Sequence, residues 1–302
     1  MKKFLAMMTA LVLALGLCAF AAAEGADISG LKVTTPGGAP ALALAAMAVE
    51  NPGQYTTIAA AFAGKEADFI IAPLNAGAKL YKAGKSTYKL AAVVSWGNLF
   101  FAAQKEQITE DDLKGSITLF GENTINASVV LYALKENGIE PAEVTYLAGA
   151  ADTQSLLLSD ENAIVVTAEP ALTAARMKND KITGIGVNDL LKQANGMDGY
   201  TQAALFVKAE TAENNPEAVA EFLKQAEEAC GKCTTDVTAV AEAAAALEIL
   251  PNAKVAEKAI PGCAIRFVSA KDAKEQVEKT AQIDLSQFGG EVPADDFYYG
   301  AE

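Results

Sequence analysis

Short apolar segments recur along the chain and alternate with amphipathic stretches. Asp68–Ala72 and Tyr88–Ser95 are almost wholly apolar in their centres, which is typical of strands buried on both faces. Leu74–Lys82, between them, has its apolar residues at helical spacing and is followed by Gly84, a frequent helix terminator. Strands that alternate with helices in this way predict an α/β fold in which helices cover both faces of parallel sheets.

The alternation runs through two cycles. Two short apolar strands, Leu99–Ala103 and Gln202–Val207, separate the cycles, as expected for a chain that crosses once into a second lobe and once back. The remaining predicted strands are Leu31–Thr35, Ser116–Leu119, Val144–Leu147, Ala163–Thr167 and Ile182–Val187. The predicted helices besides 74–82 are Ala41–Val49, Ile125–Asn137, Ala151–Leu158, 169–177, Pro216–Ala229, Asp236–Leu250 and Lys271–Ile283.

We therefore predict two doubly wound lobes joined by a two-strand hinge. Lobe one combines residues 28–101 with 203–290, lobe two spans 104–200, and residues 291–302 form a C-terminal tail. A single large doubly wound domain is the alternative. The chain has 302 residues, which suits two medium lobes better than one core.

The N-terminal segment indicates export. Two lysines precede the apolar run Phe4–Leu17, and small residues follow, so residues 1–23 have the pattern of a secretory signal peptide. The run is shorter than the ~20 residues of a membrane-spanning helix. Lipid attachment at Cys18 is the less favoured alternative, because that processing requires a small residue where Leu17 stands. We expect the mature protein outside the cytoplasmic membrane, in the periplasm or at the cell surface.

Composition excludes several classes of function. The chain holds 38 acidic and 24 basic residues, a formal charge of −14, and loss of the two signal lysines would make it −16. Such a surface repels nucleic acid, so we expect no nucleic-acid partner. The chain has no histidine, which excludes Ser-His-Asp and Cys-His catalysis and His-ligated zinc. We predict no catalytic residue, metal or cofactor.

Three cysteines follow the predicted signal peptide. Cys230 and Cys233 have CxxC spacing but end a helical run rather than opening one after a strand, which disfavours redox catalysis. A structural disulfide from one of them to Cys263 suits an oxidising compartment. Three reduced thiols are equally compatible with the sequence.

The loops after the predicted strands are the candidate ligand site. Ligands of open α/β sheets bind at the carboxyl ends of strands, beside helix N-termini. Residues 36–39 and 121–124 are such loops, Trp96 is the only tryptophan, and Glu169 follows a strand of lobe two. The alternatives are plain turns, a core Trp96 and a Glu169 that only caps a helix. The predicted ligand-binding residues are Thr35, Gly37, Gly38, Ala39, Asn75, Trp96, Asn98, Asn123, Thr124 and Glu169.

Four motifs carry a resemblance to a known family: Thr34–Pro40 (TTPGGAP), Ala67–Asn75 (ADFIIAPLN), Leu90–Asn98 and Thr167–Ala171 (TAEPA). With them the chain resembles the extracytoplasmic solute-binding proteins of ABC transporters, in the branch of nitrate, sulfonate and taurine receptors and NMT1/THI5-like proteins. The sequence departs from the pattern of this family in two respects. Arg176 and Arg266 are the only arginines, and the missing histidine excludes the THI5-type synthase.

The resemblance implies a type II periplasmic-binding fold and a non-enzymatic role. A monomer would capture a small organic nutrient between its lobes and deliver it to a membrane ABC permease. Lobe one would form the resting half-site, which Asn123, Thr124 and Glu169 of lobe two complete on closure. A lyase or dehydratase on the same scaffold, similar to menaquinone-pathway proteins, and a ligand-sensing receptor module remain the alternatives.

Overall fold

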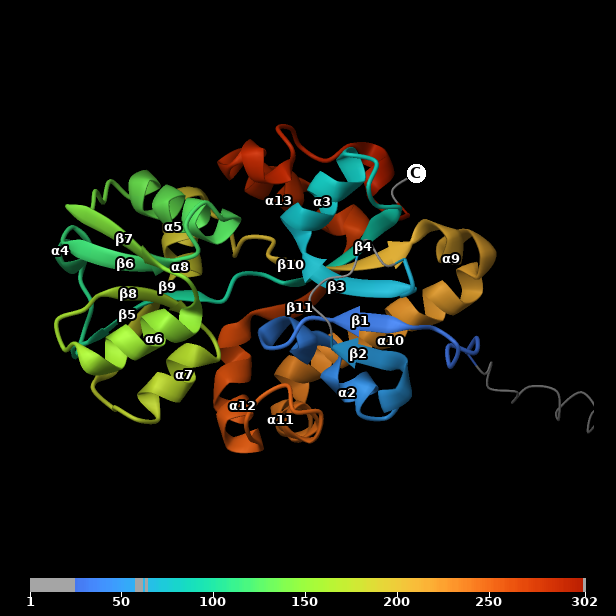
Figure 1. Ribbon diagram of the computed structural model, residues 1–302, viewed down its shortest axis with the longest axis horizontal. Helices are drawn as coiled ribbons and strands as arrows, with labels where there is room; N and C mark the ends of the chain where they lie inside the picture. The colour runs from blue at the N-terminus through green and yellow to red at the C-terminus, as the bar shows by residue number, and fades with distance from the viewer. Residues whose placement is uncertain (1–24, 58–61, 63–64, 301–302) are drawn as a thin grey trace, which may run out of the picture.

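The computed structural model describes residues 25–57, 62 and 65–300, so the predicted signal peptide and Cys18 lie outside the described residues. The described chain forms two β-sheets side by side, each flanked by helices (Figure 1). We call the six-stranded sheet with its helices lobe one, and the five-stranded sheet with its helices lobe two. The predicted α/β class with two lobes is confirmed.

Lobe one is built from both ends of the chain. Its strand order is β11-β4-β10-β3-β1-β2. Its strands are β1 (Val33–Thr35), β2 (Tyr55–Thr57), β3 (Phe69–Pro73), β4 (Tyr88–Ser95), β10 (Ala203–Lys208) and β11 (Ile265–Ser269). Its α-helices are α2 (Ala45–Ala48), α3 (Leu74–Lys82), α9 (Ala209–Asn214), α10 (Pro216–Thr235), α11 (Val237–Ala246), α12 (Ala253–Ala259) and α13 (Ala270–Ile283). Its 3₁₀ helices are η1 (Ala39–Leu44), η2 (Pro52–Gln54), η3 (Ile260–Cys263), η4 (Leu285–Phe288) and η5 (Asp295–Phe297).

Lobe two is one continuous segment of the chain, on the left in Figure 1. Its strand order is β7-β6-β8-β5-β9. Its strands are β5 (Leu99–Gln104), β6 (Ser116–Phe120), β7 (Glu143–Leu147), β8 (Val165–Ala168) and β9 (Ile182–Gly186). Its helices are α4 (Glu110–Leu113), α5 (Ile125–Glu136), α6 (Ala150–Ser159), α7 (Ala171–Arg176) and α8 (Val187–Asn195).

Both sheets are mixed, so the prediction of parallel sheets was wrong for some of the strands. In lobe one, β10 lies between β3 and β4 and runs antiparallel to both. In lobe two, β5 lies between β8 and β9 and is likewise antiparallel to both. Each of these strands follows a crossing between the lobes and so enters its sheet from the opposite direction. Apolar runs report burial but carry no information about strand direction.

The chain crosses between the lobes at 96–98 and 196–202, directly before β5 and β10. The crossings pack against each other through two glycines with positive φ. A Cβ on Gly97 would lie 2.5 Å from the Tyr200 ring, and one on Gly199 would lie 2.3 Å from the carbonyl oxygen of Trp96. Only glycine combines this backbone conformation with such close approach. The pair of crossings is therefore one tightly packed unit.

The predicted tail belongs to the core of lobe one. Phe297 and Tyr298 are buried, and the Tyr299 N–H donates to the Leu90 carbonyl at 2.8 Å. The Phe297 ring lies 6.1 Å from that of Phe206 in β10. An aromatic cluster inside an acidic segment thus fixes the chain end on the sheet. Among the described residues, no helix is long and apolar enough to cross a membrane.

Candidate ligand-binding cleft

A cavity of ≈ 420 Å³ lies between the lobes, within the range of small-molecule sites. Lobe one supplies most of its wall, the first turn of α5 supplies the facing part, and Asn98 of the first crossing lies between them. The described lining residues are Pro36, Pro40, Pro73, Asn75, Ala76, Asn98, Thr124, Ile125, Asn126, Gln202, Ala203 and Gln287. They are apolar or bear neutral polar groups.

The first turn of α3 presents Asn75 at the cleft. Strand β3 ends at Pro73, which is also the residue before the helix, and the Leu74 N–H donates to the Gln202 carbonyl at 2.9 Å. This bond fixes the helix start against the second crossing. Among the described residues, none hydrogen-bonds the half-buried Asn75 amide. Its donors and its acceptor are thus available to a ligand.

A chain of hydrogen bonds orients the next two amides. The Ser95 hydroxyl donates to Gln202 Oε1 at 3.2 Å, and Gln202 Nε2 donates to Asn98 Oδ1 at 3.0 Å. Asn98 Nδ2 then donates to the Glu169 carbonyl at 2.8 Å. Each amide nitrogen carries two N–H groups and uses one of them here. The chain leaves one N–H on Gln202 and one on Asn98, in side chains that are already held in place.

The first turn of α5 contributes the facing wall. Thr124, rather than Asn123, caps the helix: its Oγ1 accepts from the Ala127 N–H at 3.4 Å and donates to the Gly121 carbonyl at 2.6 Å. The hydroxyl is thereby used within lobe two. Two residues on, Asn126 Oδ1 accepts from the buried Tyr200 hydroxyl at 2.8 Å. The second crossing therefore positions an amide of lobe two.

The structure brings together only part of the predicted set. Asn75, Asn98 and Thr124 line the cleft. The loop after β1 borders it through Pro36 and Pro40. The others among the described predicted residues, which do not line it, are Thr35, Gly37, Gly38, Ala39, Trp96, Asn123 and Glu169. Their role in binding stays a prediction, and the contacts that Trp96, Asn123 and Glu169 make within the protein are as follows.

Trp96 packs against an arginine outside the cleft. Its ring is buried, its Nε1 donates to the Arg266 carbonyl at 3.1 Å, and the Arg266 guanidinium lies 4.2 Å from the ring centre. Arg266 also donates to Asp198 Oδ2 at 3.1 Å and lowers the pKa of that carboxyl. Trp96 and Asp198 belong to the two crossings, so Arg266 of β11 holds both of them to lobe one.

Glu169 stabilises its own helix. Its carboxylate accepts from the N–H and the hydroxyl of Thr173 at 3.0 and 2.9 Å, which is the helix-capping alternative. Burial raises the pKa of this carboxyl, and the Thr173 bonds partly offset the shift. A Cβ on Gly262 of lobe one would lie 2.9 Å from Glu169 Cγ, so the side chain sits against the facing lobe.

Two further contacts join the lobes beside the cleft. The Ser128 hydroxyl of α5 donates to Asp284 Oδ2 at 2.7 Å. Gln287 Nε2 donates to the Asn123 carbonyl at 3.0 Å. Asn123 itself has φ 58° and its side chain is exposed. With the Glu169–Gly262 contact, the lobes meet at two separate places.

Sequence reasoning missed Asn126, Gln202 and Gln287. Asn126 lies two residues after the end of the predicted loop 121–124 and could have been found from the strand-end rule. Gln202 stood inside a predicted strand, 202–207, which in the structure begins one residue later. Gln287 belongs to η4, a short segment without periodicity, and only tertiary packing places it at the cleft.

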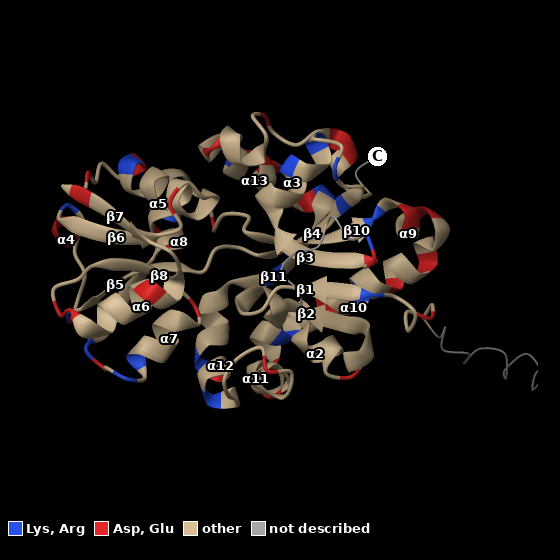
Figure 2. Cartoon of the chain, viewed as in Figure 1, with Lys and Arg blue, Asp and Glu red and all other residues tan. Residues whose placement is uncertain are grey.

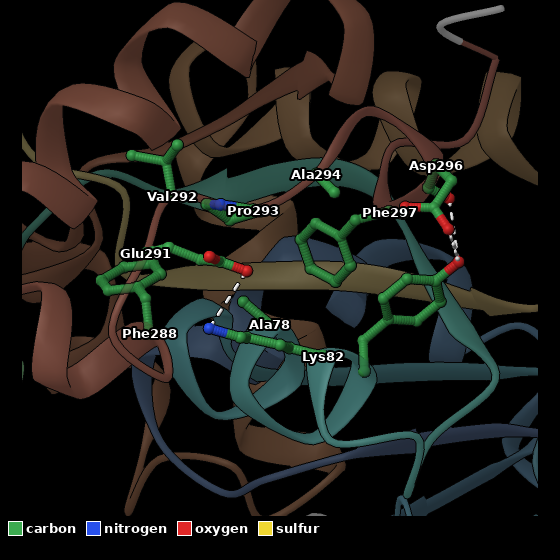
Figure 3. Close-up of a pocket in the computed structure, with 10 residues that line it drawn as sticks. Ala78, Lys82, Phe288, Glu291, Val292, Pro293, Ala294, Asp296 and Phe297 are labelled. Carbon is green, nitrogen blue, oxygen red and sulfur yellow. Dashed lines mark hydrogen bonds and ion pairs between the residues drawn. The ribbon is translucent and has the colours of Figure 1, made fainter.

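A second cavity of ≈ 250 Å³ lies between α3 and the C-terminal segment (Figure 3). Lys82 reaches Glu291 at 3.0 Å across it, and the Tyr81 hydroxyl donates to Asp296 Oδ2 at 3.2 Å. Its walls are Phe288, Phe297 and aliphatic residues of one lobe. These contacts hold the chain end in place, and the cavity is separate from the cleft.

The described cysteines are buried free thiols, as in the reduced alternative. Cys230 and Cys233 donate to the carbonyls of Ala43 and Leu42, and burial raises the pKa of Cys233 to about 12. Such thiols are poor nucleophiles and poor metal ligands. Among the described residues, no three metal-ligating side chains cluster.

Comparisons with known proteins agree with this geometry. The sequence profile of the NMT1/THI5 like family matches residues 44–236, and no curated protein sequence matches. An ABC transporter structure from Parabacteroides distasonis superposes with a TM-score of 0.77 at 21% identity, covering 90% of this chain and 99% of that one. The ligand-binding component of an ABC-type import system from Staphylococcus aureus, with zinc bound, gives 0.66 at 12%, covering 89% and 95%. The periplasmic aliphatic sulphonate binding protein SsuA from Escherichia coli gives 0.64 at 18%, covering 85% and 86%.

These structural likenesses show the fold, and the profile spans more than half of the 302 residues. The chain belongs to the NMT1/THI5-like family and has the fold of ABC-transporter solute-binding proteins.

Proposed function

We propose that the protein is an extracytoplasmic binding protein that captures a small organic molecule between its lobes and delivers it to an ABC permease. One observation carries the proposal: a cavity of ≈ 420 Å³ is lined from both lobes and from the crossing between them. The family, the import-system neighbours and the signal-like N-terminus support it.

The mechanism is closure around the two crossings. A ligand that contacts α3 and η4 on one side and α5 on the other binds the closed arrangement more tightly than the open one, and so shifts the population towards closure. The inter-lobe contacts Ser128–Asp284 and Gln287–Asn123 lie beside the ligand space and form only when the lobes meet. The closed lobes would present one surface to the permease.

Native mass spectrometry of protein purified from its own host tests the proposal. We expect a fraction of the protein to carry one small molecule, and scattering from the ligand-free protein to give a larger radius of gyration. Ligand-independent dimensions, together with a bound molecule that is chemically converted, would contradict a binding role and indicate an enzyme.

A further inference from the structure

The proposed function does not specify the chemical class of the ligand. The residues that line the cleft restrict which classes can bind. None of the described residues that line the cavity carries a charge. Charged residues lie instead on peripheral elements such as α9, which is largely red in Figure 2 and contains Glu210 and Glu213. An ionised ligand enclosed here would lose its hydration without meeting a charged side chain of the described lining, which is costly, and the N-termini of α3 and α5 would offer an anion only a partial positive charge.

Neither arginine of the chain lines the cleft. Arg266 is bound to Asp198 and stacked on Trp96, in a group of residues outside the cleft. Arg176 is at the end of α7, where its Nη2 would lie 2.9 Å from a Cβ on Gly184 of β9. The cleft therefore lacks the guanidinium fork that captures carboxylates and sulfonates in two-point fashion.

The lining supplies neutral hydrogen-bonding groups in its place. The spare N–H groups of Gln202 and Asn98 are fixed by the hydrogen-bond chain from Ser95, and Asn75 offers a donor and an acceptor without another described partner. Asn126 on the opposite wall is fixed by Tyr200. Amides with a donor and an acceptor side by side complement another amide-like group.

The rest of the wall is apolar. Pro36, Pro40, Pro73, Ile125 and Ala203 surround the amides with rigid or aliphatic surface. Burial of such surface favours a ligand with a hydrophobic part.

Resting on the proposed binding function, we propose that the cleft selects an uncharged ligand with an apolar body and an amide-like or lactam-like edge, rather than an organic anion. Asn75 of lobe one, Asn98 of the first crossing and Gln202 of the second crossing bind the polar edge. Asn126 contacts it from lobe two on closure.

Matched neutral and anionic probes test this proposal on the full mature protein: nicotinamide against nicotinate, hexanamide against hexanoate, and methanesulfonamide against methanesulfonate. Binding is measured by calorimetry and thermal shift at 20 and 500 mM NaCl. We expect the neutral member of at least one pair to bind at least about tenfold more tightly than its anion, because only the anion loses hydration uncompensated. Its affinity should be nearly unchanged by salt.

Asn75→Asp is the diagnostic variant and Asn215→Asp is its control. Both exchange an amide for a carboxylate at a helix N-terminus, where a negative charge is favourable, so both should fold. Asn75→Asp should weaken binding of the neutral probe about tenfold, by removing a donor and adding repulsion. Asn215→Asp, on the exposed start of α10, should leave it unchanged.

The remaining outcomes distinguish failure of the neutral-ligand proposal from failure of the proposed binding function. Preference for the anions, with affinity that falls at high salt, overturns the neutral-ligand proposal and leaves the binding function standing. If no probe binds, the charge of the molecule that co-purifies decides: a neutral molecule supports the proposal and an anion overturns it. No probe binding and no co-purified molecule would overturn both.

Discussion

The two sheets differ in the size of the buried hydrophobic clusters that cover their faces. In lobe one, the strands alternate between two large buried clusters: Ile70 and Phe206 face one, Phe69 and Leu205 the other. Lobe two shares the first of these clusters on the face covered by α5 and α8. Its opposite face, under α6 and α7, has a small cluster of Ala102, Leu157, Val165, Leu172, Ala175 and Ile182.

The difference follows from how each lobe is assembled. Lobe one joins the start of the chain to its end, so α10 and α13 cover strands far away in sequence and enclose both faces of the sheet. Lobe two is local, its helices are partly exposed, and its edge strand β7 has no fully buried residue. We infer that lobe one is the stable platform for the cleft, and that lobe two is the lighter part that moves.

The largest expected effect is in the core of lobe one. Phe206 is fully buried and contacts Phe62 edge-on with the ring centres 5.1 Å apart. Phe206→Ala should lower the free energy of unfolding by about 3–5 kcal/mol, through lost burial and a cavity the sheet cannot fill. Leu157→Ala, in the small buried cluster of lobe two, should lower the free energy of unfolding by only about 2 kcal/mol, because α6 can shift and partly fill the space left. Urea unfolding measures both, and equal losses would contradict the comparison.

A smaller effect tests how closely α3 packs on lobe one. A Cβ on buried Gly77 would lie 2.3 Å from the Phe206 ring. Gly77→Ala should therefore destabilise by about 1–3 kcal/mol despite the better helix propensity of alanine. Gly231→Ala in α10 is the matched control: its Cβ meets nothing within 4 Å, so we expect a gain of up to ~1 kcal/mol. A gain in thermal stability for both variants would contradict the close packing of α3, because it would mean that the helix can shift away from Phe206 at no cost.

Sequence reasoning worked best where the burial pattern lies in the residues of the element itself. Helix 74–82 and strand 88–95 were predicted with the bounds that the structure has. Strand β11 was missed because only its first residue is buried, and α8 because it begins directly after β9, where the predicted strand ran on to Val187. The hydrophobic pattern of a segment shows how its own residues are buried. It gives no signal where a segment is held in place only by contacts from a neighbouring element.

The same limit applies to the cleft. The strand-end rule found Asn75, Asn98 and Thr124, because the direction of a strand and the start of the next helix are local facts. It could not show that the Trp96 ring packs against Arg266, 170 residues away in the sequence. Nor could it show that Gln287, after the last helix, returns to the cleft.

The contact between the lobes can be loosened by one methyl group. Gly262→Ala places a Cβ 2.9 Å from Glu169 Cγ, and Glu169 is held by Thr173, so the lobes must separate slightly. We expect about 1 kcal/mol less stabilisation of the closed form, which is about fivefold in ligand affinity. The readouts are the fraction carrying a co-purified molecule and the radius of gyration. Gly53→Ala, with open space at its Cβ, is the control, and unchanged occupancy in Gly262→Ala would contradict the role of this contact.

The smallest effect is a pH dependence at the same contact. Burial, which the facing lobe reinforces, raises the pKa of Glu169 from its usual 4.5, so the folded protein keeps this proton at pH values where the unfolded chain has lost it. The folded state then binds more protons than the unfolded state, and the contribution of Glu169 to stability falls as pH rises from about 4.5 through the folded pKa. Glu169→Gln removes that loss, so the variant should gain stability relative to wild type as the pH rises above about 4.5. Urea unfolding at several pH values measures the gain, with exposed Glu161→Gln as a control that should follow wild type. A Glu169→Gln difference that is constant or shrinks with rising pH would mean that the facing lobe does not bury this carboxyl in solution, and that lobe two stands further from the platform than the structure places it.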